Sequence, residues 1–109
     1  MELKDLRNEI DEIDDQLVKL FTKRMEVSAK IAGVKKEKSL PIFVPARERE
    51  KLADVAEKAG PDMANYTRVL YSMLFELSRS HQNKLNGKIS PLYNRITQAI
   101  ENTDRKSVV

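Results

Sequence analysis

The sequence contains no cysteine, a single histidine, no tryptophan and only three glycines. Without cysteine, neither a disulfide framework nor a thiolate metal site can form, and His81 alone has no partner with which to hold zinc. The chain also lacks a glycine-rich phosphate loop and any GxSxG, HExxH or EF-hand pattern. We therefore expect no metal site.

Long apolar runs are absent as well. No segment approaches the roughly 20 consecutive apolar residues that a membrane-spanning helix needs, and the N-terminal segment MELKDLRNEIDEIDD is charged throughout. We expect no membrane association and a cytoplasmic protein. With 109 residues and 40% hydrophobic content, the chain has the size of a single domain.

The net charge of +3 comes from the C-terminal end of the chain alone. Residues 1–38 carry nine basic and nine acidic side chains, residues 39–83 six and six, and residues 84–109 five and two. A nucleic-acid surface needs a basic face on the folded part, and single-strand binders add aromatic stacking platforms, of which this chain has few. We expect no nucleic-acid partner.

An apolar stripe with helical spacing runs along the first third of the chain. It comprises Leu3, Leu6, Ile10, Ile13, Leu17, Leu20, Val27, Ile31 and Val34. The three- and four-residue steps predict one helix from about Lys4 to about Lys38, roughly 50 Å long. A compact monomer of this size has a radius of gyration of about 13 Å, so the apolar stripe would stay exposed unless a second chain covered it.

The rest of the chain predicts three further segments. Residues 39–45 contain two prolines and read as a loop, followed by a helix from about Ala46 to Ala59 that Gly60 and Pro61 end. A long helix from about Asp62 to Asn86 follows. We expect residues 1–86 to form the domain and residues 87–109 a tail or linker. The tail contains a short helix through Leu92, Ile96 and Ile100, and residues 102–109 look frayed.

Arg24 breaks the apolar stripe, and a guanidinium at such a position needs an anionic partner. An ion pair with a carboxylate of a packed helix is one interpretation. The other involves Lys35, which lies about 16 Å further along the helix and only about 20° away around it. Two long cationic side chains on one face leave room between them for a small dianionic organic acid.

Other polar residues are less informative on their own. Arg7 lies about 25 Å from Arg24, too far to share a small ligand within one chain, and it is equally well explained by pairing with Asp11. Glu48 is well placed for the helix dipole. Ser78 and Gln82 share one helix face, as solvent-facing polar pairs also do.

Taken in order, the segments LRNEID, KRMEVSAKIAGVKK, the proline loop entering ARERE, and ELSRSHQ resemble the all-helical class of chorismate mutases. The resemblance covers residues 3 to about 85. It implies an all-α fold of three helices, long, short and long, in an intertwined homodimer. It also implies conversion of chorismate to prephenate, in phenylalanine and tyrosine biosynthesis, without cofactor or metal.

The resemblance also implies roles for individual residues. Arg24 and the partner's Arg7 would take the two carboxylates of the substrate, with Arg47 supporting them. Lys35 and Gln82 would hydrogen-bond the ether oxygen whose bond to carbon breaks. The remaining contacts would be Glu48 to the ring hydroxyl and Ser78 to a carboxylate. Val44 departs from the family pattern, because better-known members carry an aspartate there that helps to position the hydroxyl; a backbone N–H could still serve.

Such a site suits a unimolecular [3,3] rearrangement. The protein needs only to hold the reactive conformer and to stabilise negative charge developing on the ether oxygen. Two alternatives stay open. One is an isochorismate pyruvate lyase on the same fold, and the other is a helical dimerisation or regulatory module without turnover. The tail suggests a linker to a further domain, as in bifunctional proteins in which a mutase precedes a prephenate dehydratase.

Overall fold

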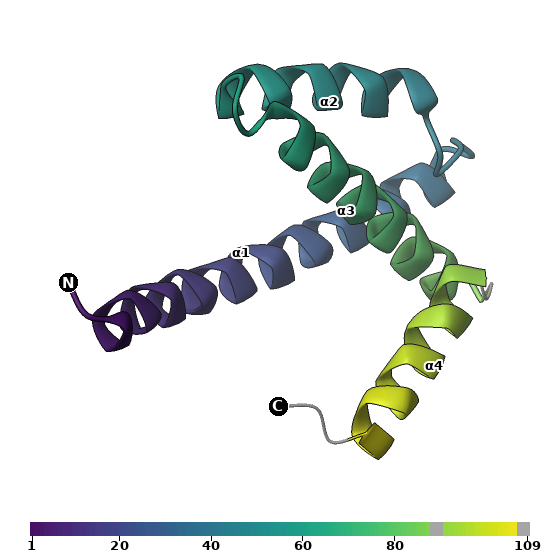
Figure 1. Ribbon diagram of the computed structural model, residues 1–109. Helices are drawn as coiled ribbons and strands as arrows, with labels where there is room; N and C mark the ends of the chain where they lie inside the picture. Colours follow the sequence, from purple (N-terminus) through teal and green to yellow (C-terminus); the bar gives the residue numbers. More distant parts are fainter. Residues whose placement is uncertain (88–90, 107–109) are drawn as a thin grey trace.

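The computed structural model describes residues 1–87 and 91–106, and every regular element in these ranges is an α-helix (Figure 1). The helices are α1 (Leu3–Glu37), α2 (Pro45–Ala59), α3 (Ala64–Leu85) and α4 (Pro91–Lys106). The predicted all-α class is confirmed. The predicted bounds of the first three helices differ from those observed by at most two residues.

Local sequence signals account for the helix ends. The backbone N–H of Glu2 donates to Asp5 Oδ2 at 3.2 Å, which places an acidic side chain at the amino end of α1. Pro45 is the first residue of α2, where its missing N–H costs nothing. Gly60 follows α2 with a φ of 85°, a conformation that glycine adopts without the steric cost that a side chain would bring.

The third helix holds the chain together. α3 packs against α2, crosses α1 near the carboxyl half of α1, and contacts α4 (Figure 1). The buried apolar residues among those described are few, namely Ala32, Val55, Ala56 and Phe75. A core of this size is small for a chain of 109 residues, so most apolar side chains remain outside it.

The apolar stripe of α1 is exposed along its whole length. Every one of its nine members has at least 44% of its surface exposed, and Leu20 reaches 65%. The chain is correspondingly extended, with a radius of gyration of 16.9 Å and principal dimensions of 54 × 39 × 21 Å. A single copy therefore leaves a long hydrophobic face in contact with water, which is unusual for a soluble monomer.

The C-terminal segment is more helical than the sequence suggested. The predicted helix through Leu92, Ile96 and Ile100 is present, but α4 continues to Lys106 instead of fraying from residue 102. Leu92 and Ile96 are half-buried, whereas Ile100 is exposed. The last three residues of the predicted tail, 107–109, lie outside the described part of the chain.

Candidate functional site

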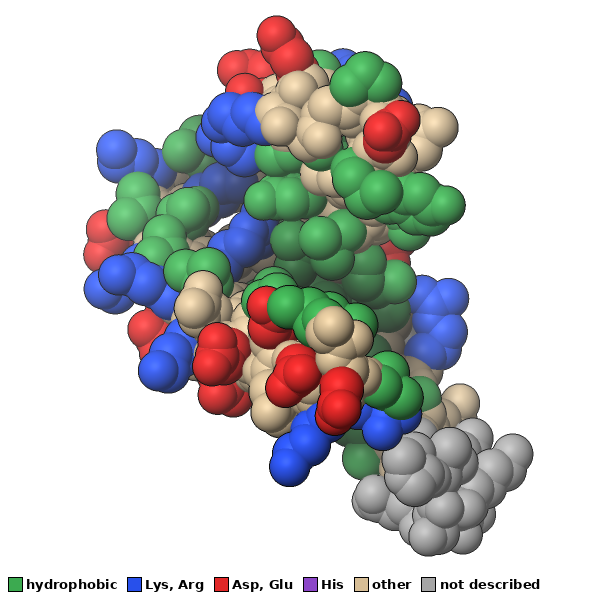
Figure 2. All heavy atoms as spheres, turned by 60° about the vertical axis from the view of Figure 1, so that its left-hand side comes forward, with side chains coloured by type: hydrophobic (Ala, Val, Ile, Leu, Met, Phe, Trp, Pro, Cys, Tyr) green, Lys and Arg blue, Asp and Glu red, His purple; other side chains and the backbone are tan. Residues whose placement is uncertain are grey.

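A cavity of about 360 Å³ lies between the carboxyl half of α1, the loop before α2, the first turns of α2 and the carboxyl half of α3. It is lined by Arg24, Ile31, Lys35, Ile42, Val44, Arg47, Glu48, Lys51, Phe75, Arg79 and Gln82. Figure 2 shows Lys and Arg side chains inside a hollow that is bordered by hydrophobic side chains. A cavity of this volume is large enough for a small organic ligand.

Arg24 reaches the cavity from α1 and is held by residues of α3. Its Nη1 donates to Ser78 Oγ at 2.9 Å, and its guanidinium carbon lies 5.9 Å from the ring centre of Tyr71 and 5.8 Å from that of Phe75. Both rings are within the range of cation–π attraction. Among the described residues no carboxylate pairs with Arg24, so the structure does not support the alternative of an internal ion pair.

Lys35 is the last residue of α1 that lines the cavity, two residues before the helix ends. Its Nζ donates to the backbone carbonyl of Ile42 at 2.9 Å, which ties α1 to the loop that leads into α2. An ammonium has three N–H donors, so this bond leaves two for a ligand. No carboxylate is paired with Lys35 within the ranges that the structure covers.

Two cations on α2 have acidic neighbours. Arg47 pairs with Glu50 at 3.8 Å, and both side chains are largely exposed. Lys51 pairs with Asp54 at 3.2 Å, and Asp54 also accepts from Lys58. These hydrogen bonds, that from Lys58 first, hold the pKa of Asp54 below its ordinary value. The charge of Arg47 and Lys51 is thus partly balanced on the surface.

Among the described residues that line the cavity, Glu48 is the only acidic one, and its Oε2 accepts a hydrogen bond from Nη1 of Arg79. The side chains of Glu48 and Arg79 are 23% and 26% exposed, so this ion pair is largely shielded from water. The side chains that line the cavity carry a net positive charge, and Arg24 and Lys35 have no acidic partner in the described chain. This charge favours a negatively charged ligand.

Gln82 is 6% exposed and lies deep in the wall contributed by α3. Its Nε2 donates both to the backbone oxygen and to the hydroxyl of Ser28, each at 2.9 Å. These two bonds use both hydrogens of the amide nitrogen. Gln82 must therefore turn its amide before it can donate to a ligand.

The structure brings together six of the eight residues predicted from the sequence, namely Arg24, Lys35, Val44, Arg47, Glu48 and Gln82. Ser78 lies behind the cavity wall, where it bonds Arg24. Arg7 is exposed near the start of α1, remote from the cavity, and forms no ion pair with Asp11 in the described chain.

Sequence reasoning missed three polar residues of the site, Ser28, Lys51 and Arg79. Helical spacing contained the signal for two of them. Lys51 lies four residues after Arg47, and Arg79 lies three residues before Gln82, so each shares a helix face with a predicted site residue. Ser28 also lies four residues after Arg24, but a serine within a charged helix gives no sign of being buried.

Two absences hold for the described residues. No group of three or more His, Cys, Asp or Glu side chains is arranged there to hold a metal ion. Among the helices of the described ranges, none is both long enough and apolar enough to cross a bilayer.

Comparison with known proteins identifies a family and several partial relatives. The sequence matches the family described as chorismate mutase type II over residues 6–83. It is 48% identical to the T-protein of Haemophilus influenzae over 61 residues, 53% of this chain and 16% of that protein. It is 47% identical over 49 residues to the bifunctional chorismate mutase/prephenate dehydratase of Aquifex aeolicus, 45% of this chain and 14% of that protein.

A T-protein of Enterobacter agglomerans is 43% identical over 58 residues, again 53% of this chain and 16% of the relative. The aligned part of the chain thus spans only about a sixth of the length of these relatives. No solved structure gives a significant match to the chain.

Proposed function

The chain belongs to the chorismate mutase type II family, and on that premise we propose that it converts chorismate to prephenate. The observation that carries the proposal is the pair Arg24 and Lys35, two cations without acidic partners in the described chain that face one cavity. Chorismate carries two carboxylates and an ether oxygen on which negative charge develops as the C–O bond breaks. A site whose cations are already oriented stabilises such a transition state more than it stabilises the substrate's ground state.

Arg24 binds one carboxylate of the substrate in this proposal. Ser78 and the rings of Tyr71 and Phe75 restrict where its guanidinium can lie, so little side-chain freedom is lost when the anion binds. Arg47, at the mouth of the cavity, adds positive charge. The second carboxylate is taken by the partner's Arg7, and we propose that Ser78 helps chiefly by holding Arg24.

Lys35 and Gln82 act at the ether oxygen. The ammonium of Lys35 has donors left after its bond to Ile42. Gln82 turns its amide, which gives up the bond from Nε2 to the Ser28 backbone oxygen, and the hydroxyl of Ser28 then donates to the Gln82 carbonyl oxygen in place of accepting from Nε2. Glu48 accepts the ring hydroxyl through its second oxygen. Val44 offers no side-chain acceptor, so Glu48 carries the hydroxyl recognition alone among the carboxylates that line the cavity.

We propose an intertwined homodimer, because the apolar stripe of α1 needs a cover and because Arg7 cannot reach the cavity of its own chain. Arg7 and Arg24 are seventeen residue steps apart along the helix, about 25 Å. Each leucine or isoleucine that a second copy buries contributes roughly 1.5–3 kcal/mol at full burial, so covering the nine partly exposed members favours association. α1 of one copy then delivers Arg7 to the cavity of the other.

A charge placed in the apolar stripe tests the dimer. Ile13→Asp should weaken association by more than about a hundredfold, because the carboxylate would be buried in the interface without a partner. Analytical ultracentrifugation over a range of concentrations measures the change. Thr22→Asp adds the same charge on the opposite face of α1 and should leave the dimer intact. A wild-type chain that sediments as a monomer at micromolar concentration would contradict the proposal.

Incubation of the purified chain with chorismate, and separately with isochorismate, tests the activity. We expect prephenate from chorismate and no pyruvate from isochorismate. Pyruvate release without prephenate formation would identify a lyase on the same fold. Turnover of neither compound would favour a dimerisation or regulatory module.

Residues beyond 83 lie outside the family match. We propose that residues 1–86 form the mutase unit and residues 87–109 a tail or linker; the Aquifex relative is described as bifunctional. The cytoplasmic location stays a prediction from the sequence.

A further inference from the structure

Arg79 is a side chain of the cavity for which the proposed chemistry has no use. It lies on α3 one turn before Gln82 and one turn after Phe75, so all three face the same cavity. Its guanidinium does not point freely at the ligand space, because it is engaged on two sides by residues of other elements. The side chain is 26% exposed, which sets it apart from a solvated surface arginine.

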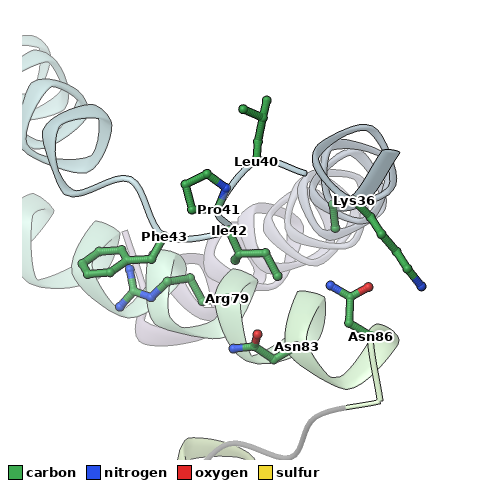
Figure 3. Close-up of a pocket in the computed structure, with 9 residues that line it drawn as sticks. Lys36, Leu40, Pro41, Ile42, Phe43, Arg79, Asn83 and Asn86 are labelled. Atoms are coloured by element: carbon green, nitrogen blue, oxygen red, sulfur yellow. The ribbon is translucent and has the colours of Figure 1, made fainter. Parts of the chain in front are cut away.

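Two contacts define the position of Arg79. Its Nη1 donates to Oε2 of Glu48 in the first turn of α2, and its guanidinium carbon lies 4.6 Å from the ring centre of Phe43. Figure 3 shows Arg79 reaching from α3 to the ring of Phe43, in the loop that leads into α2. Arg79 thus joins α3, the loop and the start of α2 at one point.

The ion pair settles the position of the Glu48 carboxylate. A glutamate has three rotatable side-chain bonds, so an unpaired Glu48 carboxylate could take several positions at the cavity. The ion pair with Arg79 selects one of these positions. It occupies Oε2 only, so Oε1 remains available as an acceptor for a ligand hydroxyl.

The lack of a side-chain acceptor at position 44 makes the orientation of Glu48 more important. Val44 lines the cavity but has no side-chain acceptor, and its backbone oxygen already accepts from the N–H groups of Arg47 and Glu48. Within the described part of the chain, Glu48 is therefore the only carboxylate lining the cavity that is available for the ring hydroxyl. Whatever orients Glu48 then decides how strongly the hydroxyl is recognised.

We propose that Arg79 is a positioning residue that fixes Glu48 as the acceptor for the ring hydroxyl and so makes the site selective for a substrate that carries this hydroxyl. The inference rests on the proposed mutase function and deepens it, since it assigns specificity to a side chain that never needs to touch the reacting bond. A site built to hydrogen-bond a hydroxyl discriminates strongly against an analogue that lacks it, because its polar groups are then left unpaired.

The test compares kcat/KM for chorismate and for an analogue with hydrogen in place of the ring hydroxyl, using the full chain. Arg79→Met should lower kcat/KM for chorismate by about tenfold or more, the effect of losing a charge-assisted hydrogen bond. It should change kcat/KM for the analogue less than about twofold. Arg79→Lys keeps the charge without the planar fork and should restore part of the selectivity.

Arg68→Met is the matched control, since Arg68 is an exposed arginine of the same helix that bonds Asn65 away from the cavity. It should leave both values unchanged. Equal losses on both substrates with Arg79→Met, or no loss on either, would overturn the inference while the proposed function stands. A wild type that does not rearrange chorismate would overturn both. If Arg79→Met loses helicity in circular dichroism, Arg79→Gln takes its place in the kinetic test. The same results are then expected, and the same results would overturn the inference.

Discussion

Replacing Lys35 by alanine is expected to lower kcat for chorismate by about a hundred- to a thousandfold, the usual effect of removing one preorganised donor from developing negative charge. The ammonium is held by the carbonyl of Ile42 and has no acidic partner in the described chain, so its charge is already placed before the substrate arrives. Because that charge acts mainly in the transition state, kcat and kcat/KM should fall together. Steady-state kinetics of prephenate formation measures both.

Two variants separate this effect from a loss of structure. Lys36→Ala removes the neighbouring, exposed lysine and should retain activity within about twofold, since surface charges of this kind act weakly. Lys35→Arg keeps a cation in place and should recover part of kcat. If Lys35→Ala retained kcat with an unchanged helical circular dichroism spectrum, Lys35 would have no role at the ether oxygen and the mutase proposal would lose its main support.

The second large effect is a recovery of activity on mixing two inactive variants. Arg7→Ala and Arg24→Ala should each lose about a hundredfold or more in kcat/KM, because each removes one bidentate carboxylate contact. Refolding them together at equal concentrations gives heterodimers in which one of two sites has both arginines. Activity should rise to about a quarter of the wild-type value, since half of the dimers are mixed and each mixed dimer has one intact site.

A second mixture provides the control. Arg24→Ala and Lys35→Ala remove two groups that act in the same chain, so a heterodimer of the two has a defect in each site and should show no recovery. Failure of the Arg7 and Arg24 pair to recover, with dimers present by ultracentrifugation, would mean that Arg7 does not act across the interface.

The helices could be predicted well from the sequence because the signals for each helix lie in its own residues and their immediate neighbours. A stripe such as Leu6, Ile10 and Ile13 reports its own helix, and Pro45 and Gly60 mark ends by backbone chemistry alone. The end of α4 was misjudged because the residues from 102 onward show neither an apolar period nor a stop signal, and nothing local distinguishes such a segment from a frayed one.

Part of the site could be predicted from the sequence, because a charged residue that interrupts an apolar pattern is easily noticed. Arg24 could be noticed for that reason, and the resemblance to a family supplied the roles of Gln82 and Glu48. Arg79 and Ser28 could not be found in this way. Their importance arises from the crossing of α3 with α1 and from the approach of α2, and these juxtapositions of residues far apart in sequence have no local signature.

The alternatives for Arg24 illustrate what three-dimensional structure adds. An internal ion pair and a ligand contact are equally compatible with a lone arginine in an apolar stripe. The structure bears on the first of them, since the neighbours of Arg24 are Ser78, Tyr71 and Phe75 and no carboxylate of the described chain pairs with it. The family resemblance and this local geometry therefore support the same interpretation on separate grounds.

The exposed apolar stripe of α1 has a consequence for how the protein behaves on dilution. If the surface that needs a second copy also carries Arg7 to that copy, separation of the two chains destroys every active site at once. Below the dissociation constant of the dimer, activity should then fall with the square of total protein concentration. The turnover rate per chain would then depend on the protein concentration as well as on the substrate concentration.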